Sequence, residues 1–355
     1  MASKTIAVAM SGGVDSSVAA YLLSTSGKLI GASHFIWPES TCCRADVLAR
    51  ARAVCKSLGI GHYVIDLVEI FSRDVVGDFV NTYIAGKTPN PCIRCNQRVR
   101  FFRFYHQLKE QLILDGTLEK GEVLYFSTGH YVKIEKNQDG IFLAKARDLK
   151  KDQSYMLYKI PKEILEVSIF PLGDYLKSEV IRIAAERRIP ALPLKESQDA
   201  CFVGESYPDF IVSFSGRRDL DKPGEIVDTK GNSVGSHSGF IRYTIGQRKG
   251  LNLSNGPWYV TGIEPGKNRI IVGRQPEVPR NRFFVEELTW NMEEPAPLSA
   301  YTVKVRYNSP DIGCRIAARD ACTAEVLLDT PAIISPGQSA VFYKGDMVAG
   351  GGIIR

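Results

Sequence analysis

The segment Ala9–Ser17, which reads Ala-Met-Ser-Gly-Gly-Val-Asp-Ser-Ser, constrains the fold of this chain more than any other. It ends the apolar run Thr5–Met10 and precedes Val18–Leu23, whose spacing is helical, so a strand, a glycine turn and a helix are expected in that order. Adjacent glycines let the backbone turn tightly, so that its N–H groups, serine hydroxyls and the helix N-terminus face one concavity. This arrangement predicts a phosphate site.

The alternative is a strand-to-helix turn whose glycines serve only the backbone geometry. The segment lacks the lysine of GxxxxGK[ST] and the spacing of GxGxxG, so neither the P-loop NTPase nor the dinucleotide fingerprint fits. The complete motif Ser-Gly-Gly-Val-Asp-Ser-Ser resembles the pyrophosphate loop of the N-type ATP pyrophosphatases. That group splits ATP between its α and β phosphates and places AMP on a substrate oxygen. The resemblance implies ATP binding by Ala9, Met10, Ser11, Gly12, Gly13, Val14, Asp15, Ser16 and Ser17.

Composition narrows the class of protein. A chain of 355 residues exceeds what one core usually fills, so two or three domains are expected. No apolar run approaches the ~20 residues of a membrane span, and Met1–Lys4 leads into a strand without a signal-peptide core, which favours a cytoplasmic protein with no membrane partner. The net charge of +6 permits an RNA partner without requiring one.

Strand and helix alternate through the first part of the chain, which predicts a doubly wound parallel sheet of the α/β class. The expected strands are Lys28–Trp37, Tyr63–Asp66 and Val123–Thr128, and the expected helices are Cys42–Leu58, Ile70–Tyr83 and Val99–Leu114. A hairpin over Ile134–Ala146 and helical stretches up to Arg188 follow. Such a sheet binds its ligand at the carboxyl ends of the strands, where the glycine turn lies.

From about Pro208 the pattern changes to short β-rich runs separated by glycine-rich turns, which is typical of small barrels. The expected strands are Gly224–Asp228, Phe240–Ile245, Trp258–Ile263, Arg269–Gly273, Arg282–Trp290, Tyr301–Tyr307, Gly313–Ala318, Ala324–Leu328 and Gln338–Tyr343. We therefore predict a catalytic domain over 1–208, a central β-rich module over 209–278 and a C-terminal β-barrel over 279–355.

Eight cysteines in a cytosolic-looking chain indicate catalysis or metal binding rather than a disulfide framework. Pro89 and Pro91 are expected to prevent regular structure before Cys95, so that Cys92 and Cys95 lie in a rigid loop at a helix start that lowers a thiol pKa. The Cys-x-x-Cys spacing leaves a zinc half-site, a redox pair and part of an iron–sulfur cluster open. Cys201 falls in a polar loop, whereas Cys55, Cys314 and Cys322 are expected to be small buried hydrophobes.

A series of motifs resembles the bacterial tRNA-specific 2-thiouridylase family, in the same order and over nearly the whole chain. These motifs are Thr88–Pro91, Cys95–Asn96, Thr128–Tyr131, Lys151–Tyr155, Cys201–Gly204, Gly246–Gly250 and Ser335–Ala340. The resemblance implies a catalytic domain like the adenine nucleotide α-hydrolases. It also implies a sulfurtransferase that adenylates the C2 oxygen of the wobble uridine of tRNA, at position 34, and replaces that oxygen with sulfur. The products would be 2-thiouridine, AMP and pyrophosphate.

Residue roles follow from the same resemblance. Cys201 would hold the incoming sulfur as a persulfide, and Cys95 would release it by closing a disulfide bond. His34 and Gly129 would join the ATP site, and the target base would be contacted by Asn90, Pro91 and Cys92. The positions expected to contact tRNA are Lys151, Asp152, Gln153, Arg306, Tyr307 and Gln338, with His130 beside them unless it is an ordinary structural histidine. The implied cofactor is ATP with Mg²⁺, and the implied partners are tRNAs for Lys, Glu and Gln and a cysteine desulfurase or sulfur-carrier protein.

Two departures from the family pattern raise a second hypothesis. Many members carry an acidic residue, a proposed general base, where this chain has Cys92, and many carry methionine where it has His34. Together with Cys42 and Cys43, these residues indicate a cysteine-rich variant. Cys92, Cys95 and Cys201 would then be ligands of a [4Fe-4S] cluster with one iron free to bind sulfide.

Two rival functions remain open from the sequence. The first is another N-type ATP pyrophosphatase that adenylates a small metabolite. The second is a non-catalytic sulfur carrier or tRNA-binding protein.

Overall fold

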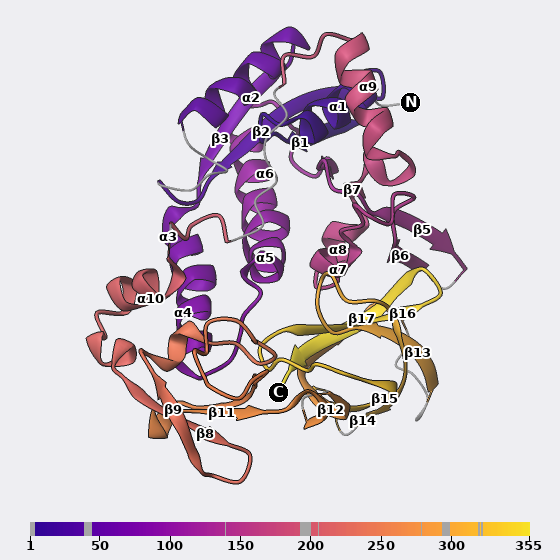
Figure 1. Cartoon of the computed structure of the whole chain (residues 1–355). Helices are drawn as coiled ribbons and strands as arrows, with labels where there is room; N and C mark the ends of the chain where they lie inside the picture. The colour runs from indigo at the N-terminus through magenta and orange to yellow at the C-terminus, as the bar shows by residue number, and fades with distance from the viewer. Residues whose placement is uncertain are drawn as a thin grey trace. The chain divides into compact units, whose positions relative to one another are not determined.

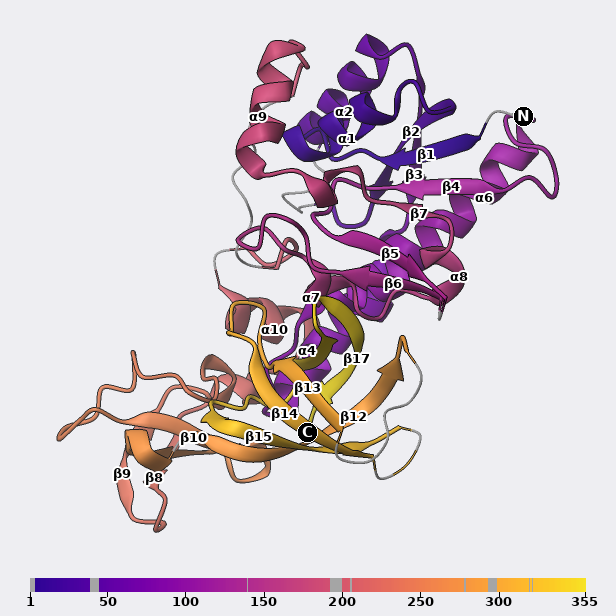
Figure 2. The ribbon, with the colours of Figure 1, turned by 90° about the vertical axis from the view of Figure 1, so that its right-hand side faces the viewer.

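The structure is a computed structural model that describes residues 4–38, 45–138, 140–191, 200–204, 206–277, 279–292, 299–318, 320 and 322–355. The chain divides into two compact units (Figures 1 and 2). The first comprises residues 1–75, 92–202 and 346–348, and the second comprises residues 76–91, 203–345 and 349–355. The predictions for Cys42 and Cys43 fall outside the described residues.

The first unit contains a five-stranded parallel sheet, which confirms the predicted α/β class. Its order is β3-β2-β1-β4-β7. The strands are β1 (Thr5–Ala9), β2 (Lys28–Phe35), β3 (Gly61–Asp66), β4 (Leu124–Ser127) and β7 (Ser168–Ile169). β7 lies within a stretch predicted to be helical, because two residues are too few to show a period of two.

Helices cover both faces of this sheet. On one face, α1 (Val14–Leu23) and α2 (Ala45–Ser57) pack against strand residues such as Ile6 and Val8. On the other face, the Phe126 ring of β4 meets Phe101 and Phe104 edge-on, with ring centroids 5.7 and 5.8 Å apart. Apolar packing on both faces is the reason that β1 reads as an uninterrupted hydrophobic run.

The helix that carries the Cys-x-x-Cys pair begins earlier than predicted. It runs as α5 (Pro91–Arg94), the π-helix η2 (Cys95–Arg103) and α6 (Phe104–Leu114). The prediction that no regular element precedes Cys95 was wrong, because proline fits the first helical position, where its missing N–H costs nothing. Cys92 therefore lies in the first turn, and Cys95 lies one turn inside the helix.

Helices and a hairpin complete the first unit. The predicted hairpin is confirmed as β5 (Lys133–Asn137) and β6 (Gly140–Ala144). The remaining elements are α3 (Val68–Phe71), η1 (Ser72–Val76), α7 (Ser154–Leu157), α8 (Lys162–Leu165), η3 (Pro171–Asp174) and α9 (Lys177–Glu186). α4 (Gly77–Ile84) follows η1 in the chain and belongs to the second unit.

The second unit begins its C-terminal part with a helix where the sequence pattern indicated β structure. α10 (Tyr207–Ser215) has Ser206 as its N-cap, which accepts a bond from the Asp209 N–H, and Gly216 in the left-handed region at its end. These are ordinary start and stop signals, and proline in the first turn adds to them. The predicted strand over Phe240–Ile245 is likewise a 3₁₀ turn, η5 (Phe240–Arg242).

A small mixed sheet follows with the order β10-β11-β8-β9. Its strands are β8 (Gly224–Asp228), β9 (Ser233–His237), β10 (Tyr259–Glu264) and β11 (Arg269–Gly273). The β11–β8 pair is parallel, and the outer pairs are antiparallel. Three of these strands match predicted runs. β9, which reads Ser-Val-Gly-Ser-His, was not predicted because its two serines and its glycine resemble a turn.

The C-terminal strands form a closed six-stranded antiparallel barrel, as predicted. The order is β12-β15-β14-β13-β16-β17, and β12 also pairs with β17. The strands are β12 (Arg280–Trp290), β13 (Ser299–Lys304), β14 (Ile312–Ala318), β15 (Ala324–Ala332), β16 (Ser339–Lys344) and β17 (Met347–Ile354). β17 was not predicted, because it contains three consecutive glycines, which are unusual inside a strand. One reason for glycine here is close packing: at Gly352 a Cβ would lie 2.9 Å from the Glu286 carbonyl oxygen.

None of the helices in the described ranges has the length and apolar character needed to cross a membrane.

Candidate functional site

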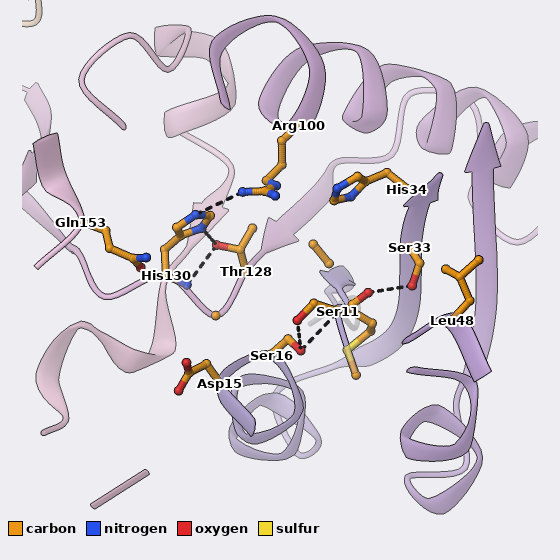
Figure 3. Close-up of a pocket in the computed structure, with 13 residues that line it drawn as sticks. Ser11, Asp15, Ser16, Ser33, His34, Leu48, Arg100, Thr128, His130 and Gln153 are labelled. Carbon is orange, nitrogen blue, oxygen red and sulfur yellow. Dashed lines mark hydrogen bonds between the residues drawn. The ribbon is translucent and has the colours of Figure 1, made fainter. Parts of the chain in front are cut away.

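A cavity of about 200 Å³ opens at the carboxyl ends of β1, β2 and β4, which is where the sheet architecture places a ligand. Its lining comes from the glycine turn, the end of β2, the helix η2 and the segment after β4 (Figure 3). The lining residues are Ala9, Met10, Ser11, Asp15, Ser16, Ser33, His34, Leu48, Arg100, Thr128, Gly129, His130 and Gln153.

The glycine turn has the tight geometry that the sequence predicts. Gly12 has a φ of +67°, and a Cβ there would lie 2.9 Å from the Val47 carbonyl oxygen, so only glycine fits. The Ser11 and Ser16 hydroxyl oxygens lie 3.1 Å apart, and the Ser11 N–H donates to the Ser16 Oγ at 3.2 Å. Two hydroxyls therefore converge at the start of α1, beside the partial positive charge of a helix N-terminus.

Gly129 brings the segment after β4 against this helix start. A Cβ at Gly129 would lie 2.6 Å from the Ser16 backbone nitrogen and 2.7 Å from the Asp15 carbonyl carbon. Both atoms belong to the backbone and cannot swing aside, so the close approach requires glycine. The structure thus places Gly129 next to the glycine turn, in agreement with its predicted membership of one site.

Lys177 pairs with Asp15 of the cavity lining, and the sequence reasoning missed it. Its Nζ atom lies 2.6 Å from both carboxylate oxygens of Asp15, and the Tyr131 hydroxyl donates to the same carboxylate at 2.8 Å. The two charged side chains are about a quarter to a third exposed. Lys177 opens α9, 162 residues after Asp15, so local spacing gave no signal of the pair.

His130 is held as a neutral imidazole. Its Nε2 lies 3.4 Å from the Arg100 Nη1, which can only donate, so the ring proton is on Nδ1 and donates to the Thr128 hydroxyl at 2.7 Å (Figure 3). Burial first, and the Arg100 charge second, lower the pKa of His130 to about 3. A histidine with this pKa carries no charge at neutral pH.

His34 presents an unsatisfied polar atom in the same lining. Its ring packs edge-on against Phe104 at 5.3 Å, and its pKa is lowered to about 3, mainly by burial and then by Arg100. Its buried Nε2 has no hydrogen-bond partner in the part of the chain that the structure describes. Because buried polar atoms are normally paired, this nitrogen fits a heteroatom of a bound ligand.

Arg100 supplies a cation to the cavity and was also missed by the sequence reasoning. It reaches down from the π-helix η2, where its Nη1 donates to the Asn96 side-chain oxygen at 3.0 Å. Asn96 in turn donates to the Met156 carbonyl oxygen at 3.0 Å, which fixes the pair. π-helical turns occur often at functional sites, and this one aims Arg100 at His130.

The cysteines differ in access. Cys92 is exposed, Cys95 is buried and Cys201 is partly exposed, and all three are thiols rather than halves of a disulfide. The neighbouring Phe202 anchors the Cys201 segment, because its ring lies 5.5 Å from Phe71 and 6.4 Å from Trp37.

The thiols do not form a metal centre as they are placed. Among the described residues, which include Cys92, Cys95 and Cys201, no group of three His, Cys, Asp or Glu side chains could hold a metal ion. A [4Fe-4S] cluster spaces its thiolates more widely than a single ion does, so the predicted ligand set of Cys92, Cys95 and Cys201 stays a prediction.

Cys55 and Cys314 are buried as predicted, and burial raises their pKa to about 11 and about 12. The same prediction was wrong for Cys322, which is exposed. Cys322 lies in the turn before β15, where its N–H donates to an Asp320 carboxylate oxygen at 2.8 Å.

The residues of the first unit that are predicted to contact tRNA lie in the turn just before α7. Asp152 is buried, and its carboxylate accepts bonds from the Ala146 N–H at 3.0 Å and the Ser154 hydroxyl at 2.7 Å. Gln153 lines the cavity and accepts a bond from the Tyr131 N–H at 3.0 Å. Lys151 is partly exposed. The structure thus gives Asp152 a role in shaping the turn, and its predicted RNA contact stays a prediction.

The predicted positions in the second unit are tied into its own framework. Arg306 donates to the Ile245 carbonyl oxygen at 3.0 Å and to the Ser335 hydroxyl. Gln338 donates to the carbonyl oxygens of Thr88 and Pro89, at 2.9 and 3.1 Å. Tyr307 is partly exposed. Asn90 and Pro91 belong to the same unit as Gln338.

Three family models match the chain in succession. They are described as a tRNA methyl transferase HUP domain over residues 4–205, a tRNA methyl transferase PRC-barrel domain over 213–274 and an aminomethyltransferase beta-barrel domain over 280–354. The chain is 39% identical to the tRNA-specific 2-thiouridylase MnmA of Moorella thermoacetica, over 98% of both chains. It is also 39% identical to the protein of that name from Acidithiobacillus ferrooxidans, over 100% of this chain and 99% of the relative.

The chain belongs to the tRNA-specific 2-thiouridylase family. This membership confirms the resemblance that the motif series indicated. Among solved structures, the U34-tRNA thiolase NcsA from Methanococcus maripaludis with its [4Fe-4S] cluster matches at 19% identity, over 62% of this chain and 68% of that chain, with a TM-score of 0.33. A likeness at that level says nothing about the thiols of this 2-thiouridylase family member.

Proposed function

We propose that this protein is a tRNA-uridine 2-sulfurtransferase that uses ATP to convert the wobble uridine of tRNA to 2-thiouridine. The observation that carries the proposal is the full-length similarity to relatives named tRNA-specific 2-thiouridylase. The cavity at the glycine turn supports the proposal, because it offers a site for the ATP that the reaction needs. A urea-like carbonyl reacts with sulfur only after its oxygen becomes a good leaving group. Adenylation by ATP supplies that leaving group.

ATP lies in the cavity with its phosphates at the glycine turn. The hydroxyls of Ser11 and Ser16 and the N-terminus of α1 bind the phosphate oxygens. Arg100 adds positive charge, and the unpaired Nε2 of His34 meets the adenine ring. Lys177 leaves Asp15 when the phosphates arrive and binds the pyrophosphate that departs. Each assignment uses a polar group that faces the cavity or borders it.

Mg²⁺ fits this site. Asp15 and the serine hydroxyls offer oxygen atoms, which are the ligands that Mg²⁺ prefers beside phosphates. The ion would neutralise phosphate charge when bound. Asp15 would hold it, since that carboxylate borders the phosphate turn.

The reaction has three chemical steps. The uridine C2 oxygen first attacks the α phosphate of ATP, and pyrophosphate leaves. The terminal sulfur of a Cys201 persulfide then attacks C2, and AMP leaves with the oxygen. Cys95 finally attacks the Cys201 sulfur, so that the persulfide bond breaks, a Cys95–Cys201 disulfide forms and the second sulfur remains on the base. An external dithiol reductant then restores the two thiols by thiol–disulfide exchange and is itself oxidised to a disulfide.

The roles of the histidines follow from their pKa. At a pKa of about 3, His34 and His130 are weak bases, so neither is suited to remove a proton at neutral pH. They act by orientation: His130 holds Arg100 and Thr128, and His34 faces the ligand. Asn90, Pro91 and Cys92 form the segment for the target base, and the tRNA is held by Lys151, Gln153, Arg306 and Tyr307.

The domain organisation remains a proposal with boundaries near 208 and 278. The three family models support it, because their gaps fall at 205–213 and 274–280. The partners that we propose are tRNAs for Lys, Glu and Gln and a cysteine desulfurase or sulfur-carrier protein as the sulfur source.

The decisive experiment is nucleoside mass spectrometry of tRNA incubated with the protein, Mg-ATP and a sulfur source. Wild type and Cys322→Ala, which removes an exposed thiol outside the proposed chemistry, should both form 2-thiouridine. Cys201→Ala and Cys95→Ala should both abolish it. Full activity of either variant would contradict the persulfide route, and ATP cleavage with a small acid or amide but not with tRNA would favour a metabolite-adenylating enzyme.

A further inference from the structure

Arg100 is a cation in the cavity lining that has no anion to balance it. Among the residues that the structure describes, no ion pair includes Arg100, whereas Lys177 is paired with Asp15. Arg100 is only partly exposed, and a charge that is withdrawn from water normally gains a partner of opposite sign. The cavity therefore fits an anionic group of a ligand at Arg100.

The guanidinium group of Arg100 uses one nitrogen for the protein and keeps the other two for a ligand. Its Nη1 donates to the Asn96 side-chain oxygen at 3.0 Å and lies 3.4 Å from the His130 Nε2. In the part of the chain that the structure describes, Nη2 and Nε have no hydrogen-bond partner. These two nitrogens form one edge of a planar fork, which is the geometry that binds two oxygens of a phosphate. Because Arg100 lines the cavity, a bound phosphate can use that edge.

Asn96 fixes the orientation of this fork. Asn96 is buried, and its side-chain NH₂ group donates to the Met156 carbonyl oxygen at 3.0 Å. A carbonyl oxygen only accepts, so the amide of Asn96 has one possible orientation, with its own oxygen facing Arg100. The two residues lie about one turn apart on the π-helix η2, so the contact is made within one element. The free edge of Arg100 is therefore oriented before a ligand binds.

The neighbours of Arg100 indicate which phosphate of ATP it meets. The charge of Arg100 contributes to the lowered pKa of both His34 and His130, so the guanidinium lies close to both rings. In Figure 3, Arg100 lies beside His34 and away from Ser16 and Asp15. The function proposed above has the adenine at His34 and the terminal phosphates at the glycine turn. The phosphate between those two places is the α phosphate.

We propose that Arg100 binds the α phosphate of ATP and holds the same phosphate after its transfer to the uridine, with Asn96 as the residue that positions Arg100. The proposal rests on the function proposed above and assigns its two cations to different products, pyrophosphate to Lys177 and AMP to Arg100. In adenylation, the bond from the uridine oxygen to the α phosphorus forms, the bond to the pyrophosphate oxygen breaks, and the uridine N3 proton passes to water. When sulfur attacks, the C2–O bond breaks and its electron pair stays on AMP. Arg100 stabilises the negative charge on the α-phosphate oxygens in both steps.

The test measures the binding of separate parts of ATP by isothermal calorimetry without tRNA. AMP contains only the α phosphate, inorganic pyrophosphate represents the other two, and adenosine contains none. Arg100→Gln keeps an NH₂ group that can donate to Asn96 but removes the charge and the fork. It should weaken AMP binding about tenfold and leave the binding of adenosine and pyrophosphate within about twofold of wild type. Arg103→Gln makes the same change at an exposed position of the same helix, outside the cavity lining, and should bind all three like wild type.

Two further variants test the fork and its support. Asn96→Ala removes the acceptor that holds Nη1, so AMP binding should weaken about fivefold while pyrophosphate binding stays at the wild-type value. A general loss of folding would weaken both, and thermal unfolding of every variant recognises it. Arg100→Lys keeps the charge without the fork and should recover part of the AMP affinity that Arg100→Gln loses. An unchanged AMP affinity in Asn96→Ala would refute the positioning role of Asn96.

The rate of AMP formation in a single turnover, at saturating ATP and tRNA, should fall about 100-fold in Arg100→Gln and stay unchanged in Arg103→Gln. Unchanged AMP affinity in Arg100→Gln, with or without weaker pyrophosphate binding, would overturn the proposal. If the AMP affinities change as expected but wild-type protein thiolates no tRNA, the proposed function fails by itself and the role of Arg100 stands. Wild-type protein that binds neither AMP nor pyrophosphate would overturn both.

Discussion

At the residue scale, the cavity combines polar groups whose charge states differ from those of free side chains. His34 and His130 are neutral because burial and Arg100 oppose a second positive charge. Asp15 and Lys177 neutralise each other at the edge of the phosphate turn. With both histidines neutral, Arg100 leaves one net positive charge among these groups before a nucleotide enters, and a phosphate can replace Asp15 as the partner of Lys177.

Lys177→Met should weaken ATP binding by about tenfold. The change removes a cation from the phosphate turn and leaves the Asp15 carboxylate to repel the phosphates. Isothermal calorimetry without tRNA measures the effect. Lys133→Met is the matched control, because Lys133 forms a comparable ion pair with Asp174 at 2.9 Å but lies outside the cavity lining. Equal ATP affinity in wild type and Lys177→Met would remove Lys177 from the site.

His130 should make folding stability depend on pH. Its pKa of about 3 in the folded state is below the value of about 6.5 in an unfolded chain, so the unfolded state binds more protons between these values. The contribution is fully present above pH 6.5 and is lost as the pH falls toward 3, with a slope of at most about 1.4 kcal/mol per pH unit.

Urea unfolding from pH 7 to 5 checks this sign. His130→Gln should lose less stability than wild type over that range, whereas His106→Gln, on α6 outside the cavity lining, should behave like wild type. A His130→Gln protein with the same pH slope as wild type would show that His130 titrates normally.

At the element scale, the start of the α5–η2–α6 helix decides how the thiols differ. Pro91 begins the helix, so Cys92 occupies its exposed first turn and Cys95 faces the interior one turn later. The same helix continues into a π-helical stretch that directs Arg100 to the cavity. One helix therefore carries Cys92 of the proposed base-contacting segment, Cys95 as the proposed resolving thiol and Arg100 of the proposed nucleotide site.

Thiol access should follow this arrangement. Brief alkylation of native protein with iodoacetamide should label Cys92 and Cys322 first, while Cys55, Cys95 and Cys314 should react only after unfolding. Peptide mass spectrometry gives the order, and urea-unfolded protein provides the reference for full labelling. Rapid labelling of Cys95 in the native protein would show that the helix opens readily around it.

At the scale of the whole molecule, residues 76–91, from the first third of the chain, belong to the second unit, which is otherwise built from residues beyond 203. α4 packs with α10, where the Tyr83 and Tyr207 rings stack 5.1 Å apart and Phe79 lies 6.4 Å from Phe210. Residues 76–91 therefore depend on residues beyond 203 for their surroundings. The predicted catalytic domain over 1–208 is continuous in sequence, but its residues 76–91 pack against residues outside it, such as Phe210 and Thr244.

A fragment of residues 1–208 should show this dependence. The fragment keeps Tyr207, the stacking partner of Tyr83, but it lacks Phe210, Thr244 and the barrel. Residues 76–91 therefore lose most of their partners, so limited proteolysis should cut there well before it cuts the parallel sheet. The full chain under the same conditions is the control. Cleavage of the full chain and the fragment at equal rates in 76–91 would mean that these residues hold their structure alone.

The class of fold and the family could be predicted from the sequence. The glycine turn, the alternation of strands and helices and the motif order are local signals, and the α/β sheet, the barrel and the family followed from them. Local signals were misread where one residue type fits two structures. Proline can break a helix or start one, and Pro91 starts one. The cap residues of α10 were overlooked because the composition around them is typical of β structure.

Contacts between residues far apart in the sequence could not be predicted and are known from the three-dimensional structure. Lys177 pairs with Asp15, Arg100 holds His130 and Gln338 fastens Thr88 across separations of 162, 30 and 250 residues. No periodicity or motif spacing carries such information, because these contacts depend on how the elements pack and not on the chain around each residue. The same reason explains Cys322, whose exposure depends on a turn outside the barrel core rather than on its neighbours in sequence.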